Sequence, residues 1–135
     1  MADKSVTGKV YRKDGGDTLV VAQGGKIALE DYSTVTQASS ITTGVTCNAL
    51  AGAITTVSQT VAAGAEADIV VTNSKVAATD IVVACITTHT SAGTFVATVA
   101  AVAAGQFTLR LTNLHASAAG DNVLVISFYV LKASA

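Results

Sequence analysis

The sequence predicts an all-β protein: an antiparallel β-sandwich or jelly-roll-like domain preceded by an N-terminal arm with a short glycine-punctuated hairpin. Two observations support this class. Residues 106–112 alternate apolar and polar side chains with a period of two, which is the pattern of a strand with one buried and one wet face. Segments rich in Val and Thr are separated at short intervals by Gly, Asn, Asp and Ser, a spacing typical of antiparallel sandwiches.

The composition limits the classes of partner. Charged residues make up 13% of the 135 residues, against a usual ~25%, so we expect part of the surface to lie within an oligomer or against a larger body. The net charge of −1 gives no electrostatic footprint for nucleic acid or anionic lipid. No run reaches the ~18 apolar residues that span a bilayer, and the first ten residues lack the apolar region of a signal peptide, so we expect synthesis in a cytoplasm.

Residues 1–48 are expected to form the arm. Its first 14 residues are polar and mixed in charge, with Val10 and Tyr11 the only notable apolar pair, and two double-glycine blocks follow at residues 15–23 and 24–31. Paired glycines allow the positive φ angles of tight turns, so the blocks predict a small hairpin or two stacked short strands. A Ser- and Thr-rich stretch then predicts an extended connector that ends near Asn48, before a sandwich domain over residues 49–135.

The sandwich domain carries six candidate strands. Residues 94–104 also suit a helix on alanine propensity, but glycines flank them and their Val and Thr are β-branched, which favours a strand. The expected strands are residues 53–61, 67–73, 79–88, 94–102, 106–113 and 122–131.

The domain also contains an internal echo. Residues 61–83 and 102–125 share the same order of parts: an Ala-Ala-Gly turn, a strand ending in Thr-Asn, a loop, and a strand that opens after Asp. Two related halves facing each other would give the sandwich a pseudo-two-fold character. The alternative is chance similarity between two stretches that are both rich in Ala and Val.

Residues 123–131 are apolar on both faces apart from Ser127, so two different surfaces must cover them. The bulkier alternate set is predicted to face the core, together with Phe107, Leu109 and Leu111 of the preceding strand. That inward set is Leu124, Ile126, Phe128 and Val130. The opposite set provides the candidates for an oligomer interface: Val123, Val125, Tyr129 and Leu131.

Nothing in the sequence points to chemistry, and we expect no enzyme, no cofactor and no catalytic residue. Glu66 and Asp68 could imitate a glycosidase carboxylate pair, but on one strand face they are better explained as solvent-facing. No Gly-x-Ser-x-Gly elbow is present. His89 and His115 are expected in exposed loops.

Metal binding is not expected either, since a zinc site needs three or four ligands at short spacing and only Cys85 and His89 form a near pair. Three copies of His115 around a trimer axis are the alternative. Cys47 and Cys85 are predicted to be buried free thiols, with a disulfide between them as the alternative.

Two parts of the chain carry a resemblance to a known family. Residues 9–17 (KVYRKDGGD) and 24–27 (GGKI) resemble the N-terminus of small structural proteins encoded beside the major capsid gene in tailed bacteriophages. Residues 106–113 (QFTLRLTN), 118–120 (AAG) and 124–130 (LVISFYV) are similar to their C-terminal β domain.

The resemblance implies a capsid decoration or cement protein, a homotrimer seated on the major capsid protein at the virion surface, with no catalytic activity. Because the arm is too polar and too short to build a core, we expect it to dock on a partner, with capsid-contact candidates Val10, Tyr11, Arg12 and Lys13. A tail-fibre or baseplate β domain with a receptor- or sugar-binding role is the alternative. The scarcity of exposed aromatic platforms in a chain without Trp argues against sugar binding.

Overall fold

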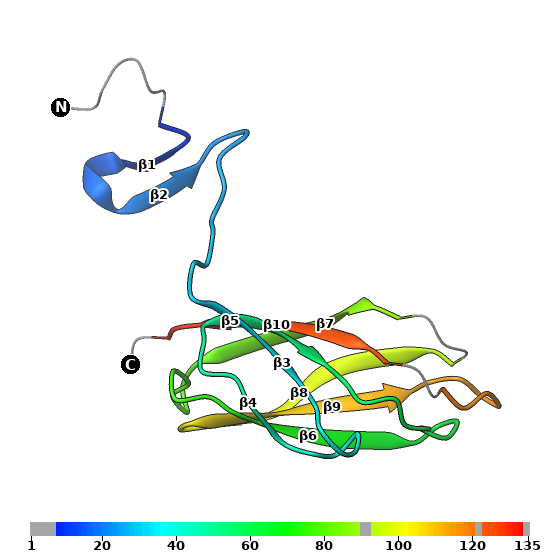
Figure 1. Ribbon diagram of the computed structural model, residues 1–135. Helices are drawn as coiled ribbons and strands as arrows, with labels where there is room; N and C mark the ends of the chain where they lie inside the picture. Colours follow the sequence, from blue (N-terminus) through cyan, green and yellow to red (C-terminus); the bar gives the residue numbers. More distant parts are fainter. Residues whose placement is uncertain (1–7, 90–92, 121–122, 134–135) are drawn as a thin grey trace.

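The computed structural model describes residues 8–89, 93–120 and 123–133, apart from the side chain of residue 14. Apart from one short 3-10 turn, every regular element in these ranges is a strand (Figure 1). In chain order the elements are β1 (Val10–Lys13), η1 (Asp14–Gly16), β2 (Thr18–Val21), β3 (Tyr32–Thr36), β4 (Val45–Thr46), β5 (Ala51–Thr55), β6 (Glu66–Thr72), β7 (Ile81–Thr88), β8 (Phe95–Ala103), β9 (Gln106–Asn113) and β10 (Val125–Leu131).

Two four-stranded sheets pack face to face, which confirms the predicted β-sandwich (Figure 1). One sheet has the order β3-β5-β10-β7 and the other the order β4-β6-β9-β8. The central pairings are antiparallel, as expected, whereas β3 runs parallel to β5 and β4 runs parallel to β6. Each sheet therefore carries one parallel strand at an edge.

Most of the predicted strands are present, with altered ends. β9 has the predicted bounds, and residues 94–102 form most of β8, so β-branched side chains and sheet pairing prevail over alanine helix propensity. The strand expected at residues 53–61 is displaced, since β5 starts at Ala51 and ends at Thr55. At the buried Thr56 the N–H still donates to the Leu124 carbonyl at 2.8 Å, but the Leu124 N–H donates to the Thr56 hydroxyl at 2.9 Å in place of a backbone carbonyl, so the regular ladder ends there.

The connector prediction is wrong, because residues 32–48 belong to the sandwich. β3 and β4 lie within this stretch and pair with the two sheets. Between them the buried Gln37 donates from its amide nitrogen to the carbonyl oxygens of Ile41, at 3.0 Å, and Thr43, at 2.8 Å. The sandwich therefore starts at Tyr32 and not near residue 49. Backbone hydrogen bonds to β5 and β6 hold these edge strands in the sheets. Their side chains alternate too little for the sequence to predict them as strands.

The predicted arm hairpin is present with a different pairing. β1 pairs antiparallel with β2, so the first double glycine forms the turn, where Gly15 has φ 73° and Gly16 has φ 104°. The block after the second double glycine forms no strand. Figure 1 shows the hairpin standing away from the sandwich, on the side of β5, β10 and β7.

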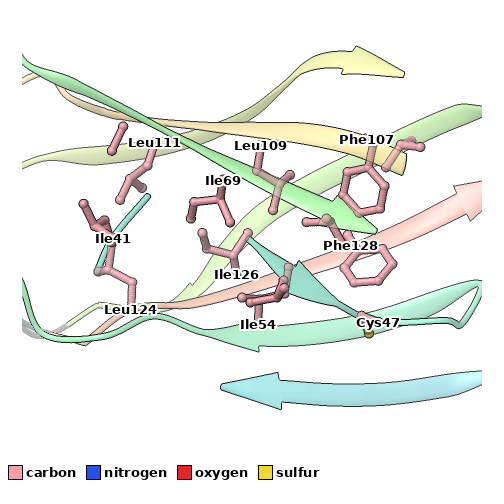
Figure 2. Packing of buried hydrophobic residues seen from close by; sticks show 14 of the residues in the cluster. Ile41, Cys47, Ile54, Ile69, Phe107, Leu109, Leu111, Leu124, Ile126 and Phe128 are labelled. Carbon is pink, nitrogen blue, oxygen red and sulfur yellow. The ribbon is translucent and has the colours of Figure 1, made fainter. Parts of the chain in front are cut away.

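The core lies between the two sheets, and the prediction of its inward faces is confirmed. The inward residues of β10 and β9 are at most 4% exposed. Figure 2 shows Phe107 facing Phe128 and Ile69 facing Ile126 across the space between the sheets. The two phenylalanine rings have centroids 5.0 Å apart at 57°. The confirmed set is Leu124, Ile126, Phe128 and Val130 with Phe107, Leu109 and Leu111.

The internal echo corresponds to a pseudo-two-fold arrangement. β6 and β9 pair antiparallel about the Ile69–Leu109 position, and the strands that follow them, β7 and β10, pair in the other sheet. Each half ends its first strand in a fully buried asparagine whose N–H donates to the turn that opens the other half. These bonds run from Asn73 to the Gly105 carbonyl at 2.8 Å and from Asn113 to the Ala65 carbonyl at 3.0 Å.

Candidate interaction surface

The outer surface of the β3-β5-β10-β7 sheet is apolar at one end, whereas Thr34, Thr36, Thr87 and Ser127 lie at the other. Register places Tyr129 beside Val83 and Leu131 beside Ile81, and all four side chains point away from the core with 41–56% of their area exposed. Neither β7 nor β10 contains a charged residue. We call this surface the apolar face and define it by Tyr32, Ile81, Val83, Cys85, Tyr129 and Leu131.

The predicted oligomer-interface residues lie on this side of the molecule. Tyr129 and Leu131 belong to the apolar face, Val125 is half-buried further along β10, and Val123 is 41% exposed just before that strand. Their contact with a neighbouring subunit stays a prediction. The β7 residues Ile81 and Val83 and the β3 residue Tyr32 are not among the residues predicted from the sequence. The signal for β7 was available, because its outward positions are as apolar as its inward ones.

The base of the arm meets the apolar face at one end. Ile27 and Leu29 line a pocket of about 310 Å³ together with Tyr129, Val130 and Leu131. Ile27 is 75% exposed and Leu29 is 42% exposed, so the arm covers this end only in part. The pocket is an apolar concavity with room for further side chains.

The hairpin of the arm has two distinct faces. Cross-strand pairing of Val10 with Val21 and of Arg12 with Leu19 places these four residues on one face, since directly opposed residues in an antiparallel pair share a face. Tyr11 and Lys13 lie on the other face. Val10 is 45% exposed, Tyr11 46% and Leu19 62%. The four capsid-contact candidates are thus exposed but divided between the two sides of the hairpin.

The opposite surface of the sandwich is polar. Arg110 on β9 donates two hydrogen bonds of 2.8 Å to the carboxylate of Asp68 on β6 and lies 3.4 Å from a carboxylate oxygen of Glu66. These hydrogen bonds lower the pKa of Asp68, and the ion pair raises the pKa of Arg110. Glu66 and Asp68 therefore point to solvent, as expected, and share one guanidinium. The two outer surfaces of the sandwich differ sharply in character, and only one is suited to dry burial.

A buried carboxylate closes one end of the apolar face. Asp80, just before β7, accepts hydrogen bonds from the backbone N–H of Ala77, the ammonium of Lys132 and the backbone N–H of Ala133. The pKa of Asp80 lies below its usual value, first because of the Ala77 N–H and next because of Lys132. This clasp fixes the segment after β10 to the turn before β7, so that the two strands of the face are tied together at their ends.

The cysteines and histidines do not converge on a site. Both thiols are free; Cys47 is buried as predicted, whereas Cys85 is exposed on β7, because its position in the strand points outward. Burial raises the pKa of the Cys47 thiol. His89 stacks edge-on against Phe95 with centroids 5.4 Å apart, and the half-buried His115 accepts two backbone N–H groups through Nδ1. The expectation that His115 is exposed is therefore corrected, because it caps its own loop.

Within the described residues, no group of three or more His, Cys, Asp or Glu side chains is arranged to hold a metal ion. The same ranges contain no helix with the length and hydropathy needed to cross a bilayer. Comparison of the chain with protein-family models, with curated proteins and with solved structures found no match.

Proposed function

We propose that this chain is a structural virion protein, a decoration or cement protein that binds the outer shell of a tailed-bacteriophage capsid as a homotrimer and stabilises it. The observation that carries the proposal is the uncharged apolar face, with Ile81, Val83, Tyr129 and Leu131 open to solvent in the single chain. Contiguous exposed apolar surfaces of this kind mark sites of protein association. The resemblance of residues 9–17 and 106–113 to phage structural proteins supports the shell as the partner.

The apolar face supports the oligomer, and the arm supports the contact with the shell. Burying Tyr129 and Leu131 between subunits removes apolar area from water, at roughly 25 cal/mol per Å². The hairpin, which projects from the sandwich in Figure 1, brings Tyr11 and Lys13 to the major capsid protein. A trimer then has three such arms. Once one arm has bound, the others bind as intramolecular events, so that weak single contacts give strong retention by avidity.

The stabilising mechanism is mechanical. A trimer that contacts several capsid subunits resists their separation because every contact must break before the trimer leaves. No group transfer or cofactor takes part in this function, and the major capsid protein is the partner in place of nucleic acid or membrane. The polar outer surface around Arg110, with its ion pairs to Asp68 and Glu66, suits the side that remains in water.

The test is binding to particles. Gold-labelled protein added to undecorated heads of the encoding phage should sediment with them and label the head surface in electron micrographs. A variant lacking residues 1–30 is the matched variant, since it keeps β3 to β10, and it should remain folded by circular dichroism but fail to bind. Labelling of the tail alone would replace the proposal with the tail-fibre function, and absence of labelling on the virion would reject both.

A further inference from the structure

Two apolar surfaces of this chain are exposed to solvent in the single chain. One is the apolar face of the sandwich. The other is the hairpin stripe, which we define by Val10, Leu19 and Val21, exposed at 45%, 62% and 39%. The hairpin that carries the stripe lies on the β5-β10-β7 side of the sandwich in Figure 1. We infer that the hairpin stripe of one copy docks on the apolar face of a second copy, so that neighbouring subunits exchange arms.

The hairpin needs such a surface for its own stability. A two-stranded ribbon in water is marginally stable at best, because it has no second layer to bury its apolar side chains. The strand pairings of β1 gather the apolar stripe on one face, where Arg12 is the only charged residue among the four that point that way. A sheet surface without charges, such as that of β7 and β10, provides the missing layer.

The contact at the base of the arm shows where this docking continues. Ile27 and Leu29 line a pocket of about 310 Å³ together with Tyr129 and Leu131, and this pocket is incompletely filled. Docking of a neighbour's hairpin would extend this existing contact across the rest of the face, towards Val83 and Cys85. The neighbour's hairpin would thus bind next to the apolar arm residues Ile27 and Leu29 at the end of the apolar face.

The direction in which the arm leaves the sandwich favours a second copy over the chain's own face. Residues 22–31 span at most about 33–36 Å when extended, and a four-stranded sheet is only about 14 Å wide between its outer strands, so the linker is long enough for the hairpin to reach a second copy. In the single chain the arm leads away from the face (Figure 1), and Ile27 and Leu29 occupy the end from which it would have to turn back. If neighbouring copies exchange arms, each hairpin stripe and each apolar face is covered in the same assembly.

The charge distribution has the matching sign. The first 30 residues contain five basic and four acidic residues, whereas the remainder contains three basic and five acidic ones. A net positive arm is attracted to a net negative sandwich, which orients the encounter between copies. The inference rests on the oligomer of the proposed function but not on the capsid. It assigns Val10 and Arg12 to the neighbouring subunit and leaves Tyr11 and Lys13, on the other hairpin face, for the shell.

The exposed Cys85 supplies a native cross-linking position on the apolar face. One full-length protein carries Leu19→Cys, Cys85→Ala and an affinity tag, and it is mixed with untagged wild-type protein and oxidised. Only a disulfide between copies can join the engineered cysteine to Cys85. We expect a tagged dimer of mixed composition, formed many-fold faster than with Thr18→Cys in place of Leu19→Cys, because Thr18 lies on the opposite hairpin face.

Two further measurements make each outcome decisive. In a chain with both Leu19→Cys and the native Cys85, a disulfide within one chain, without mixed dimers, would place the hairpin on its own sandwich and overturn the inference. Equal rates for Leu19→Cys and Thr18→Cys, or no disulfide in either experiment, would overturn it as well. Sedimentation of the wild type separates the two proposals: an oligomer without the cross-link rejects arm exchange alone, and a monomer rejects the proposed oligomer.

Discussion

Phe128 and Tyr129 are neighbours in sequence that point in opposite directions, and this makes them a matched pair for separating folding from assembly. Phe128 is 4% exposed and packs its ring against Phe107, whereas Tyr129 is 44% exposed on the apolar face. We expect Phe128→Ala to lower the free energy of unfolding and Tyr129→Asp to abolish self-association. Neither substitution should reproduce the effect of the other.

The size of the first effect follows from the packing. Replacing a buried Phe by Ala costs about 3–5 kcal/mol, through lost transfer energy and the cavity left behind. Gly52 lies directly beneath the ring, since a Cβ placed there would be 3.0 Å from a ring carbon, so no neighbouring side chain at that position can move in to fill the space. With a urea dependence of about 2 kcal/mol per M, the unfolding midpoint should fall by about 2 M.

The second effect follows from exposure. In the isolated subunit the carboxylate introduced by Tyr129→Asp would remain in water, so the free energy of unfolding should change by less than about 1 kcal/mol. In a dry interface the same charge would lack a partner and would be strongly unfavourable. Urea titration by circular dichroism together with sedimentation velocity measures both quantities, and Phe128→Leu and Tyr129→Phe are the conservative controls. A Tyr129→Asp protein that stayed fully assembled, or that lost as much stability as Phe128→Ala, would refute the assignment of the two faces.

Three further predictions concern other parts of the sandwich. Asp80→Asn should flatten the acid dependence of stability. The Ala77 N–H helps to lower the pKa of the native Asp80 carboxylate, so the stability that the carboxylate contributes is present above about pH 4 and is lost as the pH falls through the lowered pKa. Urea midpoints at several pH values measure this dependence. Gly52→Ala should cost about 1–3 kcal/mol or more in thermal unfolding, because its Cβ would lie 2.5 Å from a backbone oxygen of β3. Cys85 should react quickly with a thiol reagent in dilute subunits and slowly in the oligomer, whereas the buried Cys47 should react only on unfolding; equal rates for the two thiols would contradict their placement.

The parts of the fold that side-chain alternation encodes were predictable. β9 was found with its bounds because Phe107, Leu109 and Leu111 alternate with polar residues, and the inward face of β10 followed from the bulk of its side chains. β3 and β4 were missed because they are short edge strands held by parallel backbone pairing to β5 and β6, which no local pattern reports. Their partners lie far enough along the chain that only the assembled sheets reveal them.

The candidate interaction surface was predictable only in half. Tyr129 and Leu131 are predictable because residues 123–131 are apolar on both faces. β7 has the same pattern, but its outward residues were not predicted to belong to the surface, and Cys85 was predicted to be buried. Which apolar set of a strand points outward depends on the neighbouring strand and its register, here the pairing of Cys85 with Ser127. The pocket that Ile27 and Leu29 share with the face depends on the path of the arm. The sequence of the arm has no hydrophobic periodicity from which that path could be predicted.

The position of β10 in the middle of its sheet has a consequence for the order of events during synthesis. β8 and β9 are joined through a tight turn at Gly105 and can pair as soon as both have left the ribosome. β5 and β7 have no ladder to each other, because β10 lies between them and hydrogen-bonds to both. Their sheet therefore closes only after β10 has emerged, and this late closure over long loops is expected to be the slow step of folding. The apolar face forms in the same step, so a chain still under synthesis has no completed surface with which to assemble prematurely.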